Sequence, residues 1–380
     1  MTPELSNCSA GVFIADDQVI YGFMPNVNSR LAPHINSMTI DRIPCSPNVI
    51  DDIRQVIYLL NRLVEIKNNE RDEQDTLHIT SITIAIPGPI AVSGVRHKDV
   101  GYDYGEANGF NRRISLRNQN IYEVASSEIR KNLYASFSEE AKVQIYHDAA
   151  AYAFGEYTIR EIEYVKARCI GRDEDAYSHV KRQYYNNTVH AQILLDEGIG
   201  GAIVAFGGIA QQNMHSEMGH IIVPRHHSDY KFSSQCSMHN ADDCLESFIG
   251  IPALKRRFGD DFLNNYSAWD HKEPRLWLIA HYISYLIVNL VLVVAPTRIV
   301  LSGRIATLNK QLVRMVRGCV VDVLSSKQGD GARFPGYGSQ NEVSKYIVQP
   351  QEIDAGVYGC ALLAMPVSSA GTVAYLSGRR

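Results

Sequence analysis

The chain has 380 residues, more than one hydrophobic core usually serves, so we expect two lobes. With 45% hydrophobic residues, 21% charged residues and a net charge of −4, it has the composition of a globular protein and excludes a strongly basic binder of nucleic acid or membrane surfaces. The odd number of cysteines, seven, argues against a disulfide framework, and no secretory signal is evident at the N-terminus. We therefore predict a cytoplasmic protein.

Strand and helix patterns alternate along the first part of the chain. The predicted elements are strands over 11–15, 19–24, 78–86 and 142–146 and helices over 49–66 and 121–134. The segment His147–Glu156 is predicted to be a loop that opens a further helix. Strands that alternate with helices indicate βαβ crossovers and a mainly parallel sheet.

The second part of the chain begins with an unusual segment. Residues 160–190 are charged and rich in tyrosine, and we predict an inserted surface element there. Two strand patterns then flank Asp196–Gly201, which is typical of a β-hairpin with a glycine turn. The apolar stretch Leu276–Ala295 is nearly long enough to span a membrane, but polar residues interrupt it and no basic loops accompany it, so we predict a buried core helix. A strand over 298–303 and a helix that starts near Ala355 follow.

Four side chains that suit zinc lie within 25 positions of one another: His220, Cys236, His239 and Cys244. Zinc favours four nitrogen and sulfur ligands in a tetrahedron, and a Cys-x-x-His pair on a short loop can supply two of them. The polar residues between the four have little to bury, so a metal would supply folding energy that the loop lacks. The spacing alone leaves two alternatives open: a loop without metal, or a site that uses His215, His226 or His227.

The stretch Ser216–Leu254 closely resembles the zinc-containing fructokinase branch of the ROK (repressor, open reading frame, kinase) family of sugar kinases. In that branch an E-x-G-H motif, a C-x-x-H motif and a final Cys follow in this order, as they do here. The resemblance implies that Glu217 and His220 contact the sugar. It also implies a structural zinc ion on four ligands: His220, Cys236, His239 and Cys244.

The same resemblance implies the fold. We expect an α/β, two-lobed actin/hexokinase-like (ribonuclease H-like) sugar-kinase fold with a zinc-binding loop at 216–254. The N-terminal lobe is predicted over 1–146, joined by a C-terminal helix at about 366–380, and the C-terminal lobe over 147–365, with the charged insertion inside it.

Two further candidate sugar-side residues come from weaker matches. The segment HDAAAYAFGE resembles the family's D-x-N-A-A-A-L-G-E motif, which implies that Asp148 is the catalytic base that accepts the proton of the sugar hydroxyl. The alternative is that Asp148 caps the helix that follows. Asn108 lies in a loop where family members have an Asn or Gly-Trp, so it is a candidate sugar contact, although Asn-Gly is also an ordinary turn.

The nucleotide side departs from the family pattern. The family holds phosphates with an N-terminal D-x-G-G-T loop, and we place its counterpart at Pro3–Gly11, which lacks the paired glycines and the Asp. The second family loop, G-T-G-x-G-G, has become DEGIGG, with Asp196 and Glu197 in place of Gly and Thr. In the adenosine segment Arg304 replaces a glycine and would crowd the purine. The glycines that remain as candidate nucleotide contacts are Gly198, Gly200, Gly201 and Gly303.

Two functions are therefore in competition. The first is a fructokinase-like hexose kinase that carries a structural Zn²⁺ and transfers the γ-phosphoryl group of Mg-ATP to a sugar hydroxyl. The second is a sugar-binding protein, a sensor or partner subunit, that has lost the use of ATP. A third hypothesis pairs Asp148 with Asp196 or Glu197 to hydrolyse a sugar derivative.

Other partners are disfavoured. A DNA-binding repressor is not expected, because no helix-turn-helix region precedes the α/β domain and no basic patch is evident. We expect a hexose as ligand and a homodimer as assembly, with no nucleic acid and no membrane.

Overall fold

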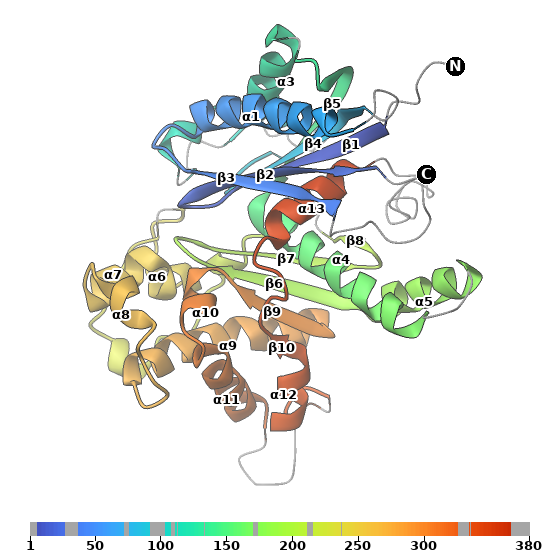
Figure 1. Cartoon of the computed structure of the whole chain (residues 1–380). Helices are drawn as coiled ribbons and strands as arrows, with labels where there is room; N and C mark the ends of the chain where they lie inside the picture. The colour runs from blue at the N-terminus through green and yellow to red at the C-terminus, as the bar shows by residue number, and fades with distance from the viewer. Residues whose placement is uncertain are drawn as a thin grey trace. The chain divides into compact units, whose positions relative to one another are not determined.

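The structure is a computed structural model of the whole chain (Figure 1). It describes residues 6–26, 37–71, 76–91, 103–107, 111, 113–132, 134–169, 174–210, 216–236, 238–325, 334 and 336–365. The strands in these ranges are β1 (Ser6–Ile14), β2 (Gln18–Pro25), β3 (Thr39–Pro44), β4 (Leu77–Ile86), β5 (Phe137–His147), β6 (Val189–Leu195), β7 (Ile199–Ala205), β8 (Gly208–Ile209), β9 (Arg298–Ser302) and β10 (Ile347–Val348). The α-helices are α1 (Val49–Asn69), α3 (Ile121–Asn132), α4 (Asp148–Arg168), α5 (Glu174–Asn187), α6 (Leu245–Ile249), α7 (Ile251–Phe258), α8 (Phe262–Tyr266), α9 (Pro274–Val294), α10 (Arg304–Leu308), α11 (Leu312–Leu324), α12 (Gln340–Tyr346) and α13 (Ala355–Ala364). Short 3₁₀ turns are η3 (Ile114–Leu116), η4 (Met218–His220) and η5 (His227–Asp229).

The chain divides into two compact units. The first consists of Met1–Asn186, Gly207–His215 and Gln351–Arg380, and the second of Asn187–Phe206 and Ser216–Pro350. The boundary predicted after residue 146 falls before the last residue of β5 and would place α4 in the second lobe. This division keeps α4 in the first unit, because α4 packs against α13. The helix predicted at about 366–380 lies outside the described residues.

The first unit is built on a five-stranded sheet with the order β3-β2-β1-β4-β5. β1 pairs antiparallel with β2 and parallel with β4, and β5 extends the sheet in parallel. Helices α1 and α3 cover one face and α13 lies against the other (Figure 1). The helical spacing that predicts α1 corresponds to its buried face, because these residues are inaccessible to solvent: Ile53, Val56, Ile57, Leu60 and Val64.

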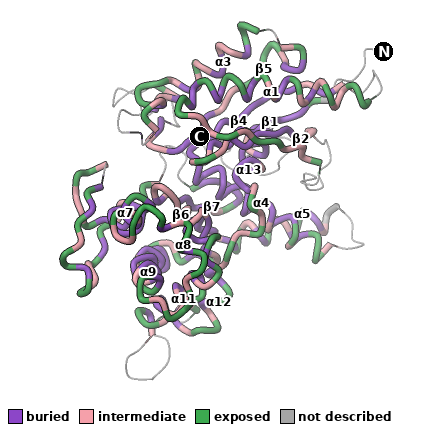
Figure 2. The backbone as a smooth tube through the Cα atoms, turned by 60° about the vertical axis from the view of Figure 1, so that its left-hand side comes forward, coloured by how far each residue is buried: buried purple, intermediate pink, exposed green. Residues whose placement is uncertain are grey.

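The second unit is built on a sheet with the order β10-β9-β6-β7-β8. Its core includes β6, β9 and the two helices α9 and α11, which pack against each other. Among the described helices of at least 18 residues, α9 alone is apolar enough to cross a membrane by length and composition. It is a core helix here, as predicted, and Figure 2 shows it buried along much of its length.

The two sheets share one topology. In each, a central strand (β1 or β6) pairs with its hairpin partner (β2 or β7) on one side and with a parallel strand (β4 or β9) on the other. A second parallel strand (β5 or β10) then pairs with that strand. The sheets are thus mixed rather than mainly parallel as predicted, because each contains an antiparallel hairpin. The shared topology makes the β1–β2 turn and the β6–β7 turn equivalent positions in the two units.

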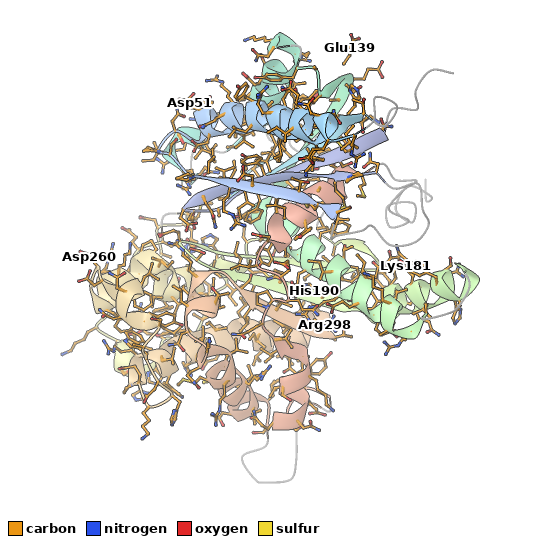
Figure 3. All side chains as sticks on the ribbon, viewed as in Figure 1. Asp51, Glu139, Lys181, His190, Asp260 and Arg298 are labelled. Atoms are coloured by element: carbon orange, nitrogen blue, oxygen red, sulfur yellow. The ribbon has the colours of Figure 1, made fainter. Side chains whose placement is uncertain are left out.

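The charged segment 160–190 is mainly helical over its described residues, 160–169 and 174–190. It comprises the C-terminal part of α4, the whole of α5 and the start of β6, and its charges and tyrosines lie partly between the two helices. Lys181, labelled in Figure 3, pairs through Nζ with Oε1 of the buried Glu161 at 3.1 Å. The rings of Tyr157 and Tyr184 lie 5.2 Å apart. The predicted surface element is therefore a helical pair with a packed interior.

Candidate functional site

The four predicted zinc ligands come together in the second unit. His220 ends η4, Cys236 and His239 lie on the loop after η5, and Cys244 is the N-cap of α6. One donor atom from each residue lies within 4.8 Å of the donor atoms of the other three. Both cysteines are buried, whereas His239 is exposed.

The spacing of these atoms fits a tetrahedral zinc ion. With Zn–S distances of about 2.3 Å and Zn–N distances of about 2.0–2.1 Å, sulfur and nitrogen ligands stand roughly 3.6 Å apart. Nδ1 of His220 lies 3.3 Å from Sγ of Cys236 and 3.9 Å from Sγ of Cys244. The same nitrogen thus faces both sulfurs at distances on either side of the expected value.

The surroundings also favour a thiolate. Hydrogen bonding with the Cys244 thiol lowers the pKa of Cys236 against the effect of burial, and interactions with His220 and backbone N–H groups lower it further. The backbone N–H of Met238 donates to Sγ of Cys236, and that of Ser247 donates to Sγ of Cys244, both at 3.4 Å. A deprotonated sulfur is the form that binds zinc.

The alternative histidine ligands do not take part among the described residues. The rings of His226 and His227 lie 4.0 Å from each other, and Nδ1 of His226 lies 2.6 Å from Oγ of Ser228. His215 lies outside the described residues.

The loop between the ligands has a second anchor that its polar sequence does not predict. Asp229 is buried, forms an ion pair with Arg257 of α7 and accepts a hydrogen bond from the Tyr282 hydroxyl at 2.7 Å. Arg225 pairs with Asp242 at 3.0 Å. The loop therefore does bury polar groups, and a metal is not its sole support.

Glu217 lies next to the metal cluster, on the far side of the His220 ring. Oε2 of Glu217 is 3.5 Å from Nε2 of His220, whose Nδ1 faces the sulfurs. Burial lowers the pKa of His220, but Cys236 and the carboxylates of Glu246 and Glu217 outweigh it and raise the pKa overall. A carboxylate behind a metal-binding histidine fixes the ring orientation. The Glu217 side chain remains 44% exposed, so it is accessible to a ligand.

Glu246 is a residue that the sequence reasoning missed. It lies in the first turn of α6, two positions after Cys244, and its Oε2 accepts the backbone N–H of Ile199 at 2.8 Å. It thus connects the helix that begins at a metal ligand with the start of β7. No local pattern reveals it, because its partner Ile199 lies 47 positions earlier in the chain.

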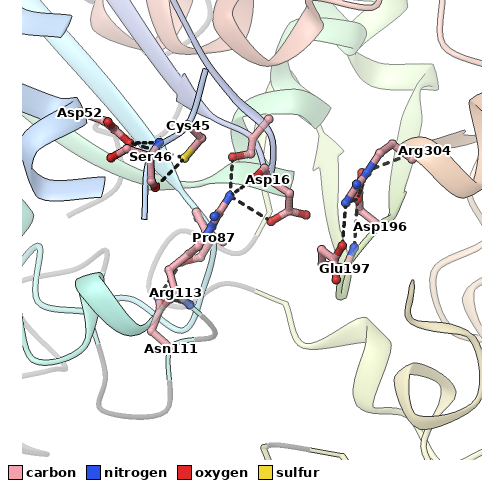
Figure 4. Close-up of polar contacts among 11 residues, drawn as sticks. Asp16, Cys45, Ser46, Asp52, Pro87, Asn111, Arg113, Asp196, Glu197 and Arg304 are labelled. Carbon is pink, nitrogen blue, oxygen red and sulfur yellow. Dashed lines mark hydrogen bonds and ion pairs between the residues drawn. The ribbon is translucent and has the colours of Figure 1, made fainter. Parts of the chain in front are cut away.

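The stretch predicted as the counterpart of the first phosphate loop is a strand, not a turn, over its described residues. The stretch Pro3–Gly11 falls mostly in β1, and the chain reverses at Ala15–Asp17, the position equivalent to the β6–β7 turn. Asp16 in this turn pairs with Arg113 at 3.5 Å, and the Arg113 guanidinium also donates to the carbonyl of Ala15 at 2.9 Å (Figure 4). Arg113 is a second residue that the sequence reasoning missed.

The second hairpin turn joins three of the predicted departures in one network. Asp196 accepts the Nε–H of Arg304 at 2.6 Å, and Glu197 accepts an Nη2–H of Arg304 at 3.1 Å (Figure 4). The sequence predicts two carboxylates and one arginine as separate obstacles to ATP. In the structure Arg304 pairs with both carboxylates, which leaves one negative charge without compensation among the three side chains.

Packing alone accounts for two of the candidate nucleotide glycines. A Cβ atom on Gly201 would lie 2.4 Å from Sδ of Met218, and one on Gly303, where φ is +83°, would lie 2.3 Å from the carbonyl oxygen of Leu195. Gly198 lies in the turn and Gly200 in β7. A nucleotide contact by any of these glycines stays a prediction.

Asp148 is the first residue of α4, directly after β5, and it is buried. His147 rather than Asp148 is the N-cap, and Oδ1 of Asp148 accepts the backbone N–H of Ala149 at 2.6 Å. The carboxylate therefore lies at the carboxyl end of a parallel strand, where open α/β sheets place functional groups. Asp148 belongs to the first unit, whereas Asp196 and Glu197 belong to the second and are engaged by Arg304.

Asn108 lies outside the described residues. The nearby Asn111 is fully buried, and its side-chain amide donates to the carbonyl of Pro87 at 2.8 Å. Its Oδ1 accepts the backbone N–H of Arg113 at 2.9 Å, so Asn111 supports the loop that carries Arg113.

The family model described as the ROK family matches residues 175–364, half of the chain. This chain belongs to the ROK family. The match contains the metal cluster, the β6–β7 turn and α13, so the ROK assignment covers the predicted zinc ligands and the second hairpin turn.

Known relatives and structures agree with the ROK assignment. A putative fructokinase of Bacillus subtilis (strain 168) is 28% identical over 176 residues, which are 45% of this chain and 53% of that protein. The chain thus spans about half the length of this relative. The ROK hexokinase from Thermus thermophilus has a similar structure, with a TM-score of 0.58, 16% identity and coverage of 94% of this chain and 97% of that one. A ROK glucokinase from Streptomyces griseus, in complex with glucose and AMPPNP, gives a TM-score of 0.55, 14% identity and coverage of 94% and 99%. At these identities the structures establish the fold, the two-lobed ROK/hexokinase-like fold predicted from the sequence.

Proposed function

We propose that this protein recognises a hexose without phosphorylating it. The observation that carries the proposal is the pair of hairpin turns at equivalent positions of the two sheets. Each holds an acidic residue paired with an arginine, Asp16 with Arg113 and Asp196 with Arg304, where the family's phosphate loops have glycines.

Acidic turns oppose the binding of ATP. Phosphates need backbone amides and small residues around them, because side chains block their approach and negative charge repels them. A carboxylate next to a triphosphate costs about 1–4 kcal/mol at the dielectric constant of a protein surface. An arginine that already pairs with a carboxylate offsets that carboxylate instead of attracting the nucleotide.

The sugar side supports hexose binding. One zinc ion would be held by His220, Cys236, His239 and Cys244, and with four protein ligands it would leave no position for a water molecule. Its contribution is thus structural: it would fix the His220 ring, and through this ring the accessible carboxylate of Glu217. Carboxylate oxygens of this kind accept hydrogen bonds from sugar hydroxyl groups.

A fructokinase-like hexose kinase that uses Mg-ATP is the second candidate. The position of Asp148 at the end of β5 favours it, as do the relatives described as fructokinases. In this reaction Asp148 would accept the proton of the sugar hydroxyl that attacks the γ-phosphoryl group. Asn108, Gly198, Gly200, Gly201 and Gly303 would then be contacts of the substrates. A homodimer and a cytoplasmic location belong to both proposals.

Thermal denaturation with a panel of hexoses and with Mg-ATP separates the two functions. A ligand present at 100 times its dissociation constant stabilises the folded state by about 2.7 kcal/mol. We expect at least one hexose to raise the melting temperature and Mg-ATP to leave it unchanged. Stabilisation by Mg-ATP, together with ATP consumption that needs a hexose and is lost in Asp148→Asn, would establish the kinase instead.

A further inference from the structure

The carboxylate of Asp196 is surrounded by hydrogen-bond donors. The backbone N–H of Glu197 donates to Oδ1 at 3.0 Å, and the backbone N–H of Arg304 donates to Oδ2 at 3.1 Å. The guanidinium of Arg304 adds the Nε–H at 2.6 Å and an ion pair through Nη2 (Figure 4). Both oxygens of the carboxylate are thus bound, one of them by a backbone amide and a cation together.

The backbone holds these donors in place independently of the Asp196 side chain. Gly303, just before Arg304, lies so close to the carbonyl of Leu195 that a Cβ atom would be 2.3 Å from that oxygen. On the other side, the backbone N–H of Ile251 donates to the carbonyl of Asp196 at 3.1 Å, and that of Asp196 donates to Gly198 at 3.0 Å. Removing the carboxylate would therefore leave the two amides facing the same point, with the side chain of Arg304, which starts from one of these amides, beside them.

Backbone amides combined with a guanidinium are a donor set that binds phosphoryl groups. We propose that the β6–β7 turn is an oxyanion site that the protein fills with its own Asp196 carboxylate, an autoinhibitory contact that keeps phosphoryl ligands out. The inference rests on the proposed function, for which it supplies the physical cause. Glu197 completes the contact, because it accepts a further N–H of the same guanidinium at 3.1 Å.

The contact is specific to the second unit. In the equivalent β1–β2 turn the guanidinium of Arg113 donates to the carbonyls of Ala15 and Asp16 and lies 3.5 Å from the Asp16 carboxylate. Carbonyl oxygens around an arginine offer no donors to an anion. We therefore place the latent oxyanion site at the β6–β7 turn alone.

The test is the binding of inorganic pyrophosphate, which carries phosphoryl groups but no nucleoside. We expect the full-length double variant Asp196→Gly/Glu197→Thr to bind pyrophosphate at least about tenfold more tightly than the unchanged protein in calorimetry at fixed salt. Adding Arg304→Gln should remove the gain. Equal affinity of the double variant and the unchanged protein would overturn the inference, as would a gain that survives Arg304→Gln.

Two controls keep the result readable. Asp196→Ser removes the charge but keeps a short polar side chain in the turn, so it should show a smaller gain and serves if the double variant does not fold. A folded Asp196→Ser variant without any gain would equally contradict the inference. Stabilisation by a hexose should be unchanged in all variants. If the unchanged protein binds no hexose, the proposed function is contradicted. If it binds a hexose but the double variant binds pyrophosphate no more tightly than the unchanged protein, only the filled oxyanion site is contradicted.

Discussion

Replacing Gly359 with alanine is expected to destabilise the first unit by roughly 3 kcal/mol, the upper range for overpacking a core. Gly359 lies on α13 where this helix crosses α4, and a Cβ atom there would lie 1.8 Å from the carbonyl oxygen of Ala151. The contact is reciprocal, because a Cβ atom on Gly155 of α4 would lie 1.9 Å from the carbonyl oxygen of Ala355. Backbone atoms cannot move aside as side chains do, so the two helices would have to separate.

The measurement is urea denaturation followed by far-ultraviolet circular dichroism. Gly318→Ala is the matched control, because Gly318 lies inside α11 and a Cβ atom there would meet nothing within 4 Å. Alanine at an open helical site should be neutral or stabilise by about 0.5–1 kcal/mol. If Gly359→Ala and Gly318→Ala unfold at the same urea concentration, the close crossing of α4 and α13 does not exist as described.

Local patterns predicted much of the fold. The spacing of apolar residues predicted α1 and α9, and the glycine-rich stretch between two strand patterns predicted the β6–β7 hairpin. β3 was missed because it is an edge strand with mostly exposed and half-buried residues, which leaves no alternation to detect. The charges of segment 160–190 predict a surface insertion, but Glu161 is buried and pairs with Lys181, and no periodicity in the sequence reveals this pairing.

In the candidate site, too, the sequence predicts local features, whereas contacts between distant residues appear only in the structure. The four zinc ligands were predicted because a metal constrains residue type and spacing along the chain. Arg304 was recognised as a departure, but its partnership with Asp196 spans 108 positions and depends on β6 and β9 lying side by side in the sheet. Arg113 and Asp16 are 97 positions apart. Charges that look prohibitive one by one in a sequence can thus be mutual partners, which only the fold decides.

Loss of one zinc ligand should have the largest effect on the second unit. Cys244→Ser is the sharpest change, because serine is itself a favoured N-cap and preserves the start of α6, while its hydroxyl does not replace the thiolate. We expect the zinc content to fall from about one equivalent to less than half. The second unit should lose more than about 3 kcal/mol, because the free energy of metal binding is part of its folding free energy and loss of a metal exceeds the usual cost of a point mutation. Elemental analysis and urea denaturation followed by the fluorescence of Trp269 and Trp277, both in the second unit, measure the two effects.

Cys319→Ser separates loss of the metal from the cost of a buried serine. Cys319 is a buried cysteine of α11 in the same unit and outside the metal cluster, so its variant should keep the zinc. Because His220 connects the cluster to Glu217 across 3.5 Å, Cys244→Ser should also weaken hexose binding, by about 10–100-fold, whereas Cys319→Ser should not. The result that contradicts the metal centre is folded, unchanged protein with less than half an equivalent of zinc. A Cys244→Ser variant that loses zinc but binds the hexose normally would be consistent with the metal centre. It would contradict the role of the metal in positioning Glu217.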